Sequence, residues 1–187
     1  TILADGKAIT ASPLGTISCV DSSTGDLLWL RKFEVDGERS GIVSKPWEIS
    51  QPVVIDEILI ALSPNGREVV SIDIVSGSIL DSWPSGVGTR FGDVRYLLSG
   101  TNGDEDLLLA VGEDIHALNP ADDFSLRWRY SDSARDENAS REGITVRTGM
   151  RGRVQAGQGR VLVPGVNDLF IVNADDGRVL DIIKTGE

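Results

Sequence analysis

The sequence has very few of the residues that build metal centres and covalent cross-links. Among its 187 residues there is one cysteine, Cys19, and one histidine, His116. A single cysteine excludes an intrachain disulfide and a cluster of thiolate ligands, and a single histidine excludes zinc sites that use a pair of histidines. We therefore expect Cys19 to be a small buried strand residue and His116 to be a structural side chain on a strand.

Long apolar runs and basic residues are also scarce. No stretch approaches the roughly 20 apolar residues that a membrane-spanning helix needs. The chain has 18 basic and 29 acidic residues, a net charge of −11. Because nucleic-acid phosphates and anionic lipids attract cationic surfaces, this balance argues against either as a partner. No signal peptide and no initiating Met precede Thr1, so we expect a processed or truncated piece.

What the sequence does have is one pattern in four copies. The clearest copy, Cys19 to Trp29, is a short β-prone segment, a Thr-Gly turn and a second segment ending in tryptophan. It returns at Ser71 to Asp81, Ala117 to Trp128 and Ile171 to Asp181. Each copy follows two further short strands joined by tight turns, so each unit is predicted to be a four-stranded antiparallel sheet. The predicted units are 1–32, 52–83, 94–130 and 152–184, joined by long linkers at 33–51, 84–93 and 131–151.

The turn inside each copy has its own chemistry. The preceding strand ends in an Asp or Asn whose side chain can accept hydrogen bonds from the turn: Asp21, Asp73, Asn119 and Asn173. Four residues later, three copies have a glycine where positive φ is expected: Gly25, Gly77 and Gly177. The third copy has Asp123 there and is one residue longer, which predicts a bulged turn.

Two copies end in tryptophan, at Trp29 and Trp128. Asp81 and Asp181 stand at that position in the other two, and Trp83 follows Asp81 by two residues on the same strand face. We expect these tryptophans to pack between neighbouring sheets, because a large aromatic side chain on an outer strand can join one sheet to the next.

The pattern Ala-x-Asp-x-x-Thr-Gly-x-x-x-Trp, here Cys19-Val20-Asp21-Ser22-Ser23-Thr24-Gly25-Asp26-Leu27-Leu28-Trp29, resembles the tryptophan-docking repeat of the quinoprotein-like (PQQ-like) β-propellers. The resemblance covers nearly the whole chain and implies an all-β fold of four four-stranded antiparallel blades. Propellers of this family usually have seven or eight blades, so four blades are half of a ring. The chain is then a fragment of a longer propeller, or a homodimer completes an eight-bladed ring, or four blades close on themselves.

The same resemblance says which chemistry to look for. Quinoprotein dehydrogenases of this family hold PQQ beside Ca²⁺ or a lanthanide, and many have an adjacent cysteine pair, Glu, Asn and Asp ligands and an Asp base. No such set can be matched here, so we expect no catalytic, cofactor-binding or metal-binding residue in this segment, although further blades could carry one. The acidic runs Asn102 to Asp106 and Asn173 to Gly177 lack the closing Glu of an EF-hand and are expected to be turns.

Basic charge is concentrated in the linkers. Residues 31–51, 84–95 and 129–153 contain 12 basic and 9 acidic residues, whereas the rest contains 6 and 20. Since the blade-to-blade connections of a propeller lie on the face opposite the Thr-Gly turns, we expect one face with long Arg-bearing loops and one acidic face of tight turns. Loops on a rigid scaffold commonly carry function. The candidate partner-binding residues are Arg90, Arg147, Arg151 and Arg153, with Trp47 as an anchor.

A simpler interpretation of the linker charges stays open. The arginines could pair with Asp93, Asp136, Glu137 and Glu142 in a solvated network, and exposed ion pairs of this kind are individually weak.

Together these features favour a non-enzymatic propeller scaffold that presents its linkers to a protein or ligand. The resemblance to BamB-like and uncharacterised bacterial PQQ-like repeat proteins implies the same function. Its partner is then another protein or the remaining blades. The alternatives are a fragment of a PQQ-dependent oxidoreductase and a sensor domain of a bacterial signalling protein. Members of the family are mostly periplasmic or secreted, so we expect the same location here.

Overall fold

The computed structural model describes residues 1–12, 15–33, 50–63, 66–86, 89, 94–102, 105–112, 114–131, 150 and 152–186. These residues form β-strands and turns without a helix, so none of them belongs to a helix that could cross a membrane. The chain divides into two compact units, Thr1–Leu97 and Leu98–Glu187, and each is considered by itself.

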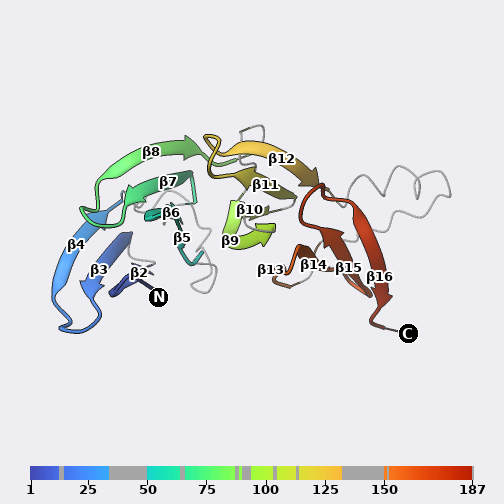
Figure 1. Cartoon of the computed structure of the whole chain (residues 1–187), viewed down its shortest axis with the longest axis horizontal. Coiled ribbons are helices and arrows are strands. Elements are labelled where there is room, and N and C mark those ends of the chain that lie inside the picture. The colour runs from blue at the N-terminus through green and yellow to red at the C-terminus, as the bar shows by residue number, and fades with distance from the viewer. Residues whose placement is uncertain are drawn as a thin grey trace, which may run out of the picture. The chain divides into compact units, whose positions relative to one another are not determined.

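The N-terminal unit contains two four-stranded antiparallel sheets, whose strands pair in chain order (Figure 1). The strands of sheet 1 are β1 Ile2–Ala4, β2 Lys7–Ser12, β3 Thr16–Asp21 and β4 Leu27–Lys32. The strands of sheet 2 are β5 Val53–Ile55, β6 Ile58–Leu62, β7 Glu68–Asp73 and β8 Ile79–Pro84.

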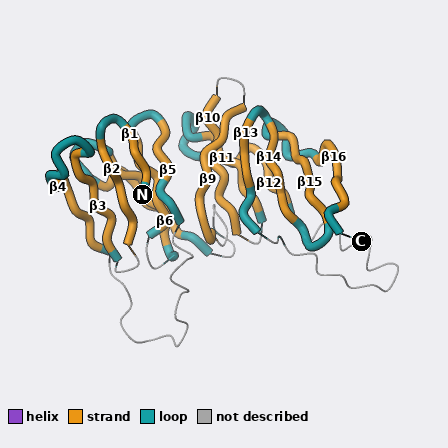
Figure 2. The backbone as a smooth tube through the Cα atoms, turned by 90° about the horizontal axis from the view of Figure 1, so that it is seen from below, coloured by secondary structure: helices purple, strands orange, loops and turns teal. Residues whose placement is uncertain are grey.

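Sheets 3 and 4 follow the same plan (Figure 2). Most of sheet 3 and all of sheet 4 lie in the C-terminal unit. The strands of sheet 3 are β9 Val94–Asn102, β10 Glu105–Gly112, β11 Ile115–Asn119 and β12 Ser125–Tyr130. The strands of sheet 4 are β13 Gln155–Gly157, β14 Arg160–Pro164, β15 Asp168–Asn173 and β16 Val179–Lys184. Four antiparallel four-stranded sheets are the fold class that the sequence predicts, and this prediction is confirmed.

Burial along the strands explains why these segments pair as they do. In β3, Ile17 and Cys19 are buried while their neighbours are only partly so, the alternation of a strand with one well-covered face. In β6 and β7 nearly every residue is buried, because both faces of sheet 2 are covered. The middle strands therefore carry the core, and in sheets 1, 2 and 4 the fourth strand is the most exposed.

The register between the third and fourth strands repeats in all four sheets. It shifts by one residue at the same place in each, a β-bulge. Just beyond the bulge, the fourth-strand residue faces an equivalent residue of the third strand: Trp29 opposite Cys19, Asp81 opposite Ser71, Trp128 opposite Ala117 and Asp181 opposite Ile171. Trp83 lies two residues further on, opposite Val69, at the position that Arg31 has in sheet 1.

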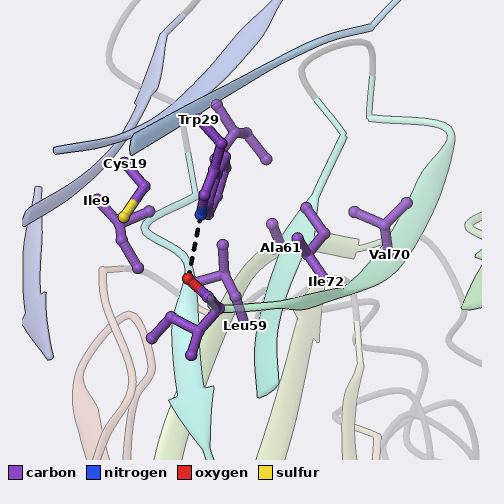
Figure 3. Packing of buried hydrophobic residues seen from close by; sticks show 9 residues of the cluster. Ile9, Cys19, Trp29, Leu59, Ala61, Val70 and Ile72 are labelled. Atoms are coloured by element: carbon purple, nitrogen blue, oxygen red, sulfur yellow. Dashed lines mark hydrogen bonds between the residues drawn. The ribbon is translucent and has the colours of Figure 1, made fainter. Parts of the chain in front are cut away.

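Trp29 joins sheet 1 to sheet 2 through the turn that follows β7. Its indole Nε1 donates a hydrogen bond of 3.0 Å to the backbone oxygen of Ile74, the residue after the turn anchor (Figure 3). The ring lies against Gly77, where a Cβ atom would come within 2.6 Å of the ring carbons. Around this contact, apolar side chains of both sheets form one core cluster: Ile9, Ile17, Cys19, Leu59, Ala61, Val70, Ile72 and Ile74.

Trp128 makes the same contact from sheet 3 to sheet 4. Its Nε1 donates a 2.8 Å hydrogen bond to the backbone oxygen of Ala174, and a Cβ at Gly177 would lie 2.9 Å from its ring. Gly77 and Gly177 have φ of +69° and +73°, so glycine is required at each position for two reasons. The left-handed backbone disfavours a side chain, and the indole occupies the space where one would stand.

This contact predicts how two equivalent glycines will differ when each is replaced by alanine. Gly25 has φ of +79°, like Gly77, but open space where its Cβ would be. We expect Gly25→Ala to lower the free energy of unfolding by about 1–2 kcal/mol through backbone strain alone. Gly77→Ala should cost about 1–3 kcal/mol more, because the methyl group displaces the Trp29 ring.

Urea unfolding of both variants, followed by tryptophan fluorescence, measures this difference. Equal losses of stability would show that the Trp29 contact does not restrict position 77.

Candidate functional site

Each sheet has two chemically different ends. At the turn end lie the turns after the first and third strands, and in sheet 1 they touch, because Ser22 N–H donates to Gly6 O at 2.9 Å. At the other end the chain leaves the fourth strand beside the turn between the second and third strands. Among the described residues, three sheets close this linker end with one backbone hydrogen bond each: Phe33 N to Gly15 O (2.7 Å), Ser85 N to Arg67 O (2.7 Å) and Thr185 N to Asn167 O (2.9 Å).

The anchor side chains at the turn end are engaged by their own turns. The Oδ1 atom of Asp21 accepts hydrogen bonds from the Ser23 and Thr24 amides, at 2.8 and 3.0 Å, and from the Ser23 hydroxyl at 2.6 Å. The Ser23 hydroxyl bond and then these amides lower the pKa of Asp21 to about 2. The hydrogen bond from the Ser76 side chain, followed by that from its amide, likewise lowers the pKa of Asp73.

The acidic run in sheet 4 is used in the same way. Asn173 Oδ1 accepts from the Asp175 amide at 2.9 Å, and Asp176 Oδ1 accepts from the Arg178 amide at 3.0 Å. Asp176 also pairs with the Arg178 guanidinium at 3.3 Å. Both side chains therefore cap amides of their own turn.

Sheet 3 departs from the other three at this turn. Asn119 still caps it, accepting a hydrogen bond from the Ala121 amide at 3.1 Å. Asp123 and Phe124 both have left-handed backbone, with φ of +44° and +51°. The two non-glycine residues supply the positive φ that glycine supplies elsewhere, in the turn for which the sequence predicts a bulge.

Four of the five predicted partner-binding residues, Trp47, Arg90, Arg147 and Arg151, lie outside the described residues, as do their proposed acidic partners. Arg153 is described: it is exposed and directly precedes the buried Val154 at the start of sheet 4.

A charged pair that the sequence interpretation missed lies at the linker end of sheet 3. Arg129 Nε donates to Asp114 Oδ2 at 3.0 Å, and a second guanidinium nitrogen contacts the same oxygen. Burial acts to raise the pKa of Asp114, but hydrogen bonds from Ser131 and Arg129 and the charge of Arg129 outweigh burial and hold it below its usual range. The available signal was an Asp just before the first strand of a predicted hairpin and an Arg near the end of its second strand, since antiparallel pairing brings these positions together.

His116 lies beside this pair, directly across the strand pairing from Arg129. It is one of the few buried polar residues. Burial first, and the Arg129 charge second, lower the pKa of His116, against a smaller opposing effect of Asp114. A neutral imidazole on a packed strand has the geometry of a structural residue.

Because His116 is the chain's only histidine, its pKa predicts a distinct pH dependence of stability. Its folded pKa is below the unfolded value of about 6.5, so the unfolded state binds the proton more readily. The contribution of His116 to the free energy of unfolding should therefore be constant above pH 7.5 and fall as the pH drops from about 7 to 5.5. Urea midpoints measured across this range should decline in the native chain and stay nearly flat in His116→Gln, whereas parallel slopes would exclude His116 as the cause.

No protein-family model matches the sequence, and no curated protein matches it significantly. Among solved structures the chain is similar to BamB from Moraxella catarrhalis, with a TM-score of 0.61 and 17% identity over 98% of this chain and 49% of that one. It is also similar to a europium-containing methanol dehydrogenase, with a TM-score of 0.59 and 14% identity over 99% of this chain and 41% of that one.

The chain thus spans about half the length, or less, of each of these structures. At such low identity the likeness shows the fold alone. Its four antiparallel four-stranded sheets match the blades of β-propeller structures.

Proposed function

We propose that this chain is a non-enzymatic propeller scaffold that binds a protein partner through the linkers at one end of its blades. The observation that carries the proposal is that the polar and aromatic side chains of the repeat are already engaged within the fold. The anchor carboxylates cap their own turns, and the two repeat tryptophans are buried in neighbouring blades. The repeat therefore builds the scaffold, and binding is left to the segments between its copies.

The linker end is suited to this role because it is fixed in position. Backbone hydrogen bonds tie the end of the fourth strand to the adjacent turn in three blades, and Arg129 and Asp114 add an ion pair in sheet 3. Long loops that leave such a fixed edge can present side chains without disturbing the core. The basic linker residues, with Arg153 exposed at the start of sheet 4, would favour an acidic partner surface.

Among the described residues, no group of three or more His, Cys, Asp or Glu side chains is placed to hold a metal ion. The thiol of Cys19 is buried in the core between the first two sheets, and burial raises its pKa. Likeness in fold to a methanol dehydrogenase keeps a quinoprotein oxidoreductase as the second candidate. The periplasmic or secreted location is part of the same proposal and rests on the family resemblance.

The scaffold proposal predicts where a bound protein touches the chain. A photocrosslinking amino acid at position 153, in cells that express the protein, should give a discrete protein adduct. The matched control is position 178, also an arginine and strongly exposed, but at the turn end of the same sheet. Charge reversal of Arg147 and Arg151 to Glu should reduce the adduct from position 153 several-fold, since rim charges steer association. Equal adducts from both positions, or none from 153, would rule out the linker end as the binding surface.

The second candidate predicts a different response to cofactor. PQQ supplied with Ca²⁺ should neither bind the chain in equilibrium dialysis nor support dye-linked oxidation of an alcohol. Stoichiometric binding of PQQ would replace the scaffold proposal by the oxidoreductase one, even without turnover.

A further inference from the structure

The fourth strand of each sheet pairs on one side only, so its other side is an edge of the sheet (Figure 1). Along a strand, the backbone N–H and C=O groups of successive residues point alternately to the two sides. In sheet 1 the amide of Phe33 donates to the oxygen of Gly15, just before β3, so every second residue counted back from Phe33 faces β3. Beyond the bulge, the residues between them direct their backbone groups to the edge: Leu30 and Lys32.

Sheet 4 has the same two outward positions. The amide of Thr185 donates to the oxygen of Asn167, just before β15, so the count back from Thr185 makes Ile182 and Lys184 the residues that face the edge. In register and in side-chain type, an aliphatic residue followed by a lysine, they match the pair in sheet 1.

A carboxylate closes the edge of sheet 4 but not that of sheet 1. Asp181 directly precedes Ile182, and its Oδ1 accepts the outward Ile182 amide at 2.8 Å. Trp29 has this place in sheet 1, and its indole N–H donates to Ile74 in sheet 2. An indole has no acceptor to offer, and no other acceptor for the Leu30 amide is found in the described part of the chain.

The edges of sheets 2 and 3 are protected in other ways. In sheet 2, Asp81 Oδ1 accepts the outward Ser82 amide at 2.7 Å, and the next outward residue, Pro84, has no N–H. In sheet 3 the edge strand carries Arg127 and Arg129, each in an ion pair, and charged side chains on an edge strand discourage pairing. Among the described edges, only that of sheet 1 therefore combines an open amide with an aliphatic side chain.

The side chains along this edge are apolar and exposed. Leu27, Leu28 and Leu30 are 61%, 46% and 53% exposed, although they belong to a paired strand. The register also places Leu27 at the end of an apolar row across sheet 1, formed by Leu3, Ala8, Val20 and Leu27. A strand added beside β4 would extend this row and remove the leucines from water, which is the favourable part of its binding.

We propose that the free edge of β4 binds an extended segment of a partner protein, which adds to sheet 1 as a further strand. Main-chain pairing gives the Leu30 amide an acceptor and the Leu30 oxygen a donor. Asp81, Pro84 and Asp181 keep such a segment off the edges of sheets 2 and 4 and so select one edge. The surface is the edge of a sheet and not a linker, so it is independent of the linker-end binding proposed above.

The side chains of β4 define the chemistry of the partner segment. β-Branched residues beside Leu28 and Leu30 would cover the two leucines. The strand ends in two basic residues; Arg31 contacts the backbone oxygen of Gly77 in sheet 2, which leaves Lys32 to pair with a carboxylate of the partner. A second copy of this chain fits less well, because antiparallel pairing of two β4 strands about Leu30 puts Leu28 of one copy, and no carboxylate, opposite Lys32 of the other.

The acetylated and amidated peptide Thr-Glu-Thr-Val-Thr-Val-Thr tests the edge, because antiparallel pairing sets its Glu opposite Lys32 and its first Val opposite Leu30. Titration of the native chain with this peptide should shift the Leu30 amide resonance saturably and slow the exchange of that proton with water several-fold. The Ile182 amide, already bonded to Asp181, should not respond. The same peptide with N-methyl groups on both valines keeps the side chains but loses the donors, and should bind about tenfold more weakly.

Three variants of the chain separate an open edge from a closed one. Leu30→Pro removes the outward N–H, as Pro84 does in sheet 2, and should abolish binding of the peptide. The matched control is Ser82→Pro, which removes the equivalent N–H from an edge that Asp81 already closes, and should leave binding unchanged. Asp181→Ala frees the Ile182 amide, so this resonance should now respond to the peptide as Leu30 does.

Four results would overturn the proposal. The first is no saturable shift of the Leu30 amide up to the solubility limit of the peptide. Equal binding of the N-methylated peptide would show apolar adsorption without main-chain pairing. A Leu30 amide protected from exchange in the monomeric native chain would mean that the chain covers its own edge. Dimerisation of the native chain that Leu30→Pro abolishes would make a second copy the occupant.

Discussion

The structure depends on a single repeated contact, an indole ring laid on a glycine of the next blade. A blade has two faces and cannot bury both by itself, so its stability depends on how it meets its neighbours. The contacts of Trp29 and Trp128 combine apolar burial with a hydrogen bond to a backbone oxygen that would otherwise be buried without a donor. The pairing also sets how closely the sheets approach, because the ring has room only where the turn has no Cβ.

The anchor turns make this contact possible. An Asp or Asn side chain caps the amides of the turn, and the amide after the anchor binds the first turn of its own blade in sheets 1, 2 and 4. In sheet 3 that residue is Pro120, which has no N–H, and the turn closes through left-handed Asp123 and Phe124. Sheet 3 thus lacks both the glycine and the usual backbone bond, and sheet 2 has Asp81 where a tryptophan would stand. Each compact unit holds one complete tryptophan–glycine pair.

The proposed division between scaffold and binding surface follows from how the side chains of the repeat are engaged. Polar side chains of the repeat form hydrogen bonds within their turns, and large apolar side chains are buried between sheets. The linkers and the outer faces are what remain for other molecules. On sheet 1 one face keeps an apolar row, and the Gly25 turn beside it has no ring above it. On sheet 4, Asp181 stands in the register that tryptophan has in sheets 1 and 3.

The sequence by itself determined the fold class, the four repeats and the position of each turn. These features follow from local rules, since an Asp or Asn, a glycine four residues later and alternating apolar residues act over a few residues. It also placed Asp81 and Asp181 in the tryptophan register. The sequence also held a signal for which turns a tryptophan covers. The residue after the anchor is apolar at Ile74 and Ala174, which are covered, and polar at Ser22, which is not.

Only the tertiary structure decided what these residues touch. The sequence explains Gly77 and Gly177 by positive φ, as it does Gly25, and gives no sign that a ring 48 or 49 residues earlier in the chain excludes their side chains. The Arg129–Asp114 pair and the burial of His116 likewise depend on strand pairing across a turn. Contacts between blades join residues far apart in the chain, and a local pattern holds no information about which of two equivalent glycines has a neighbour.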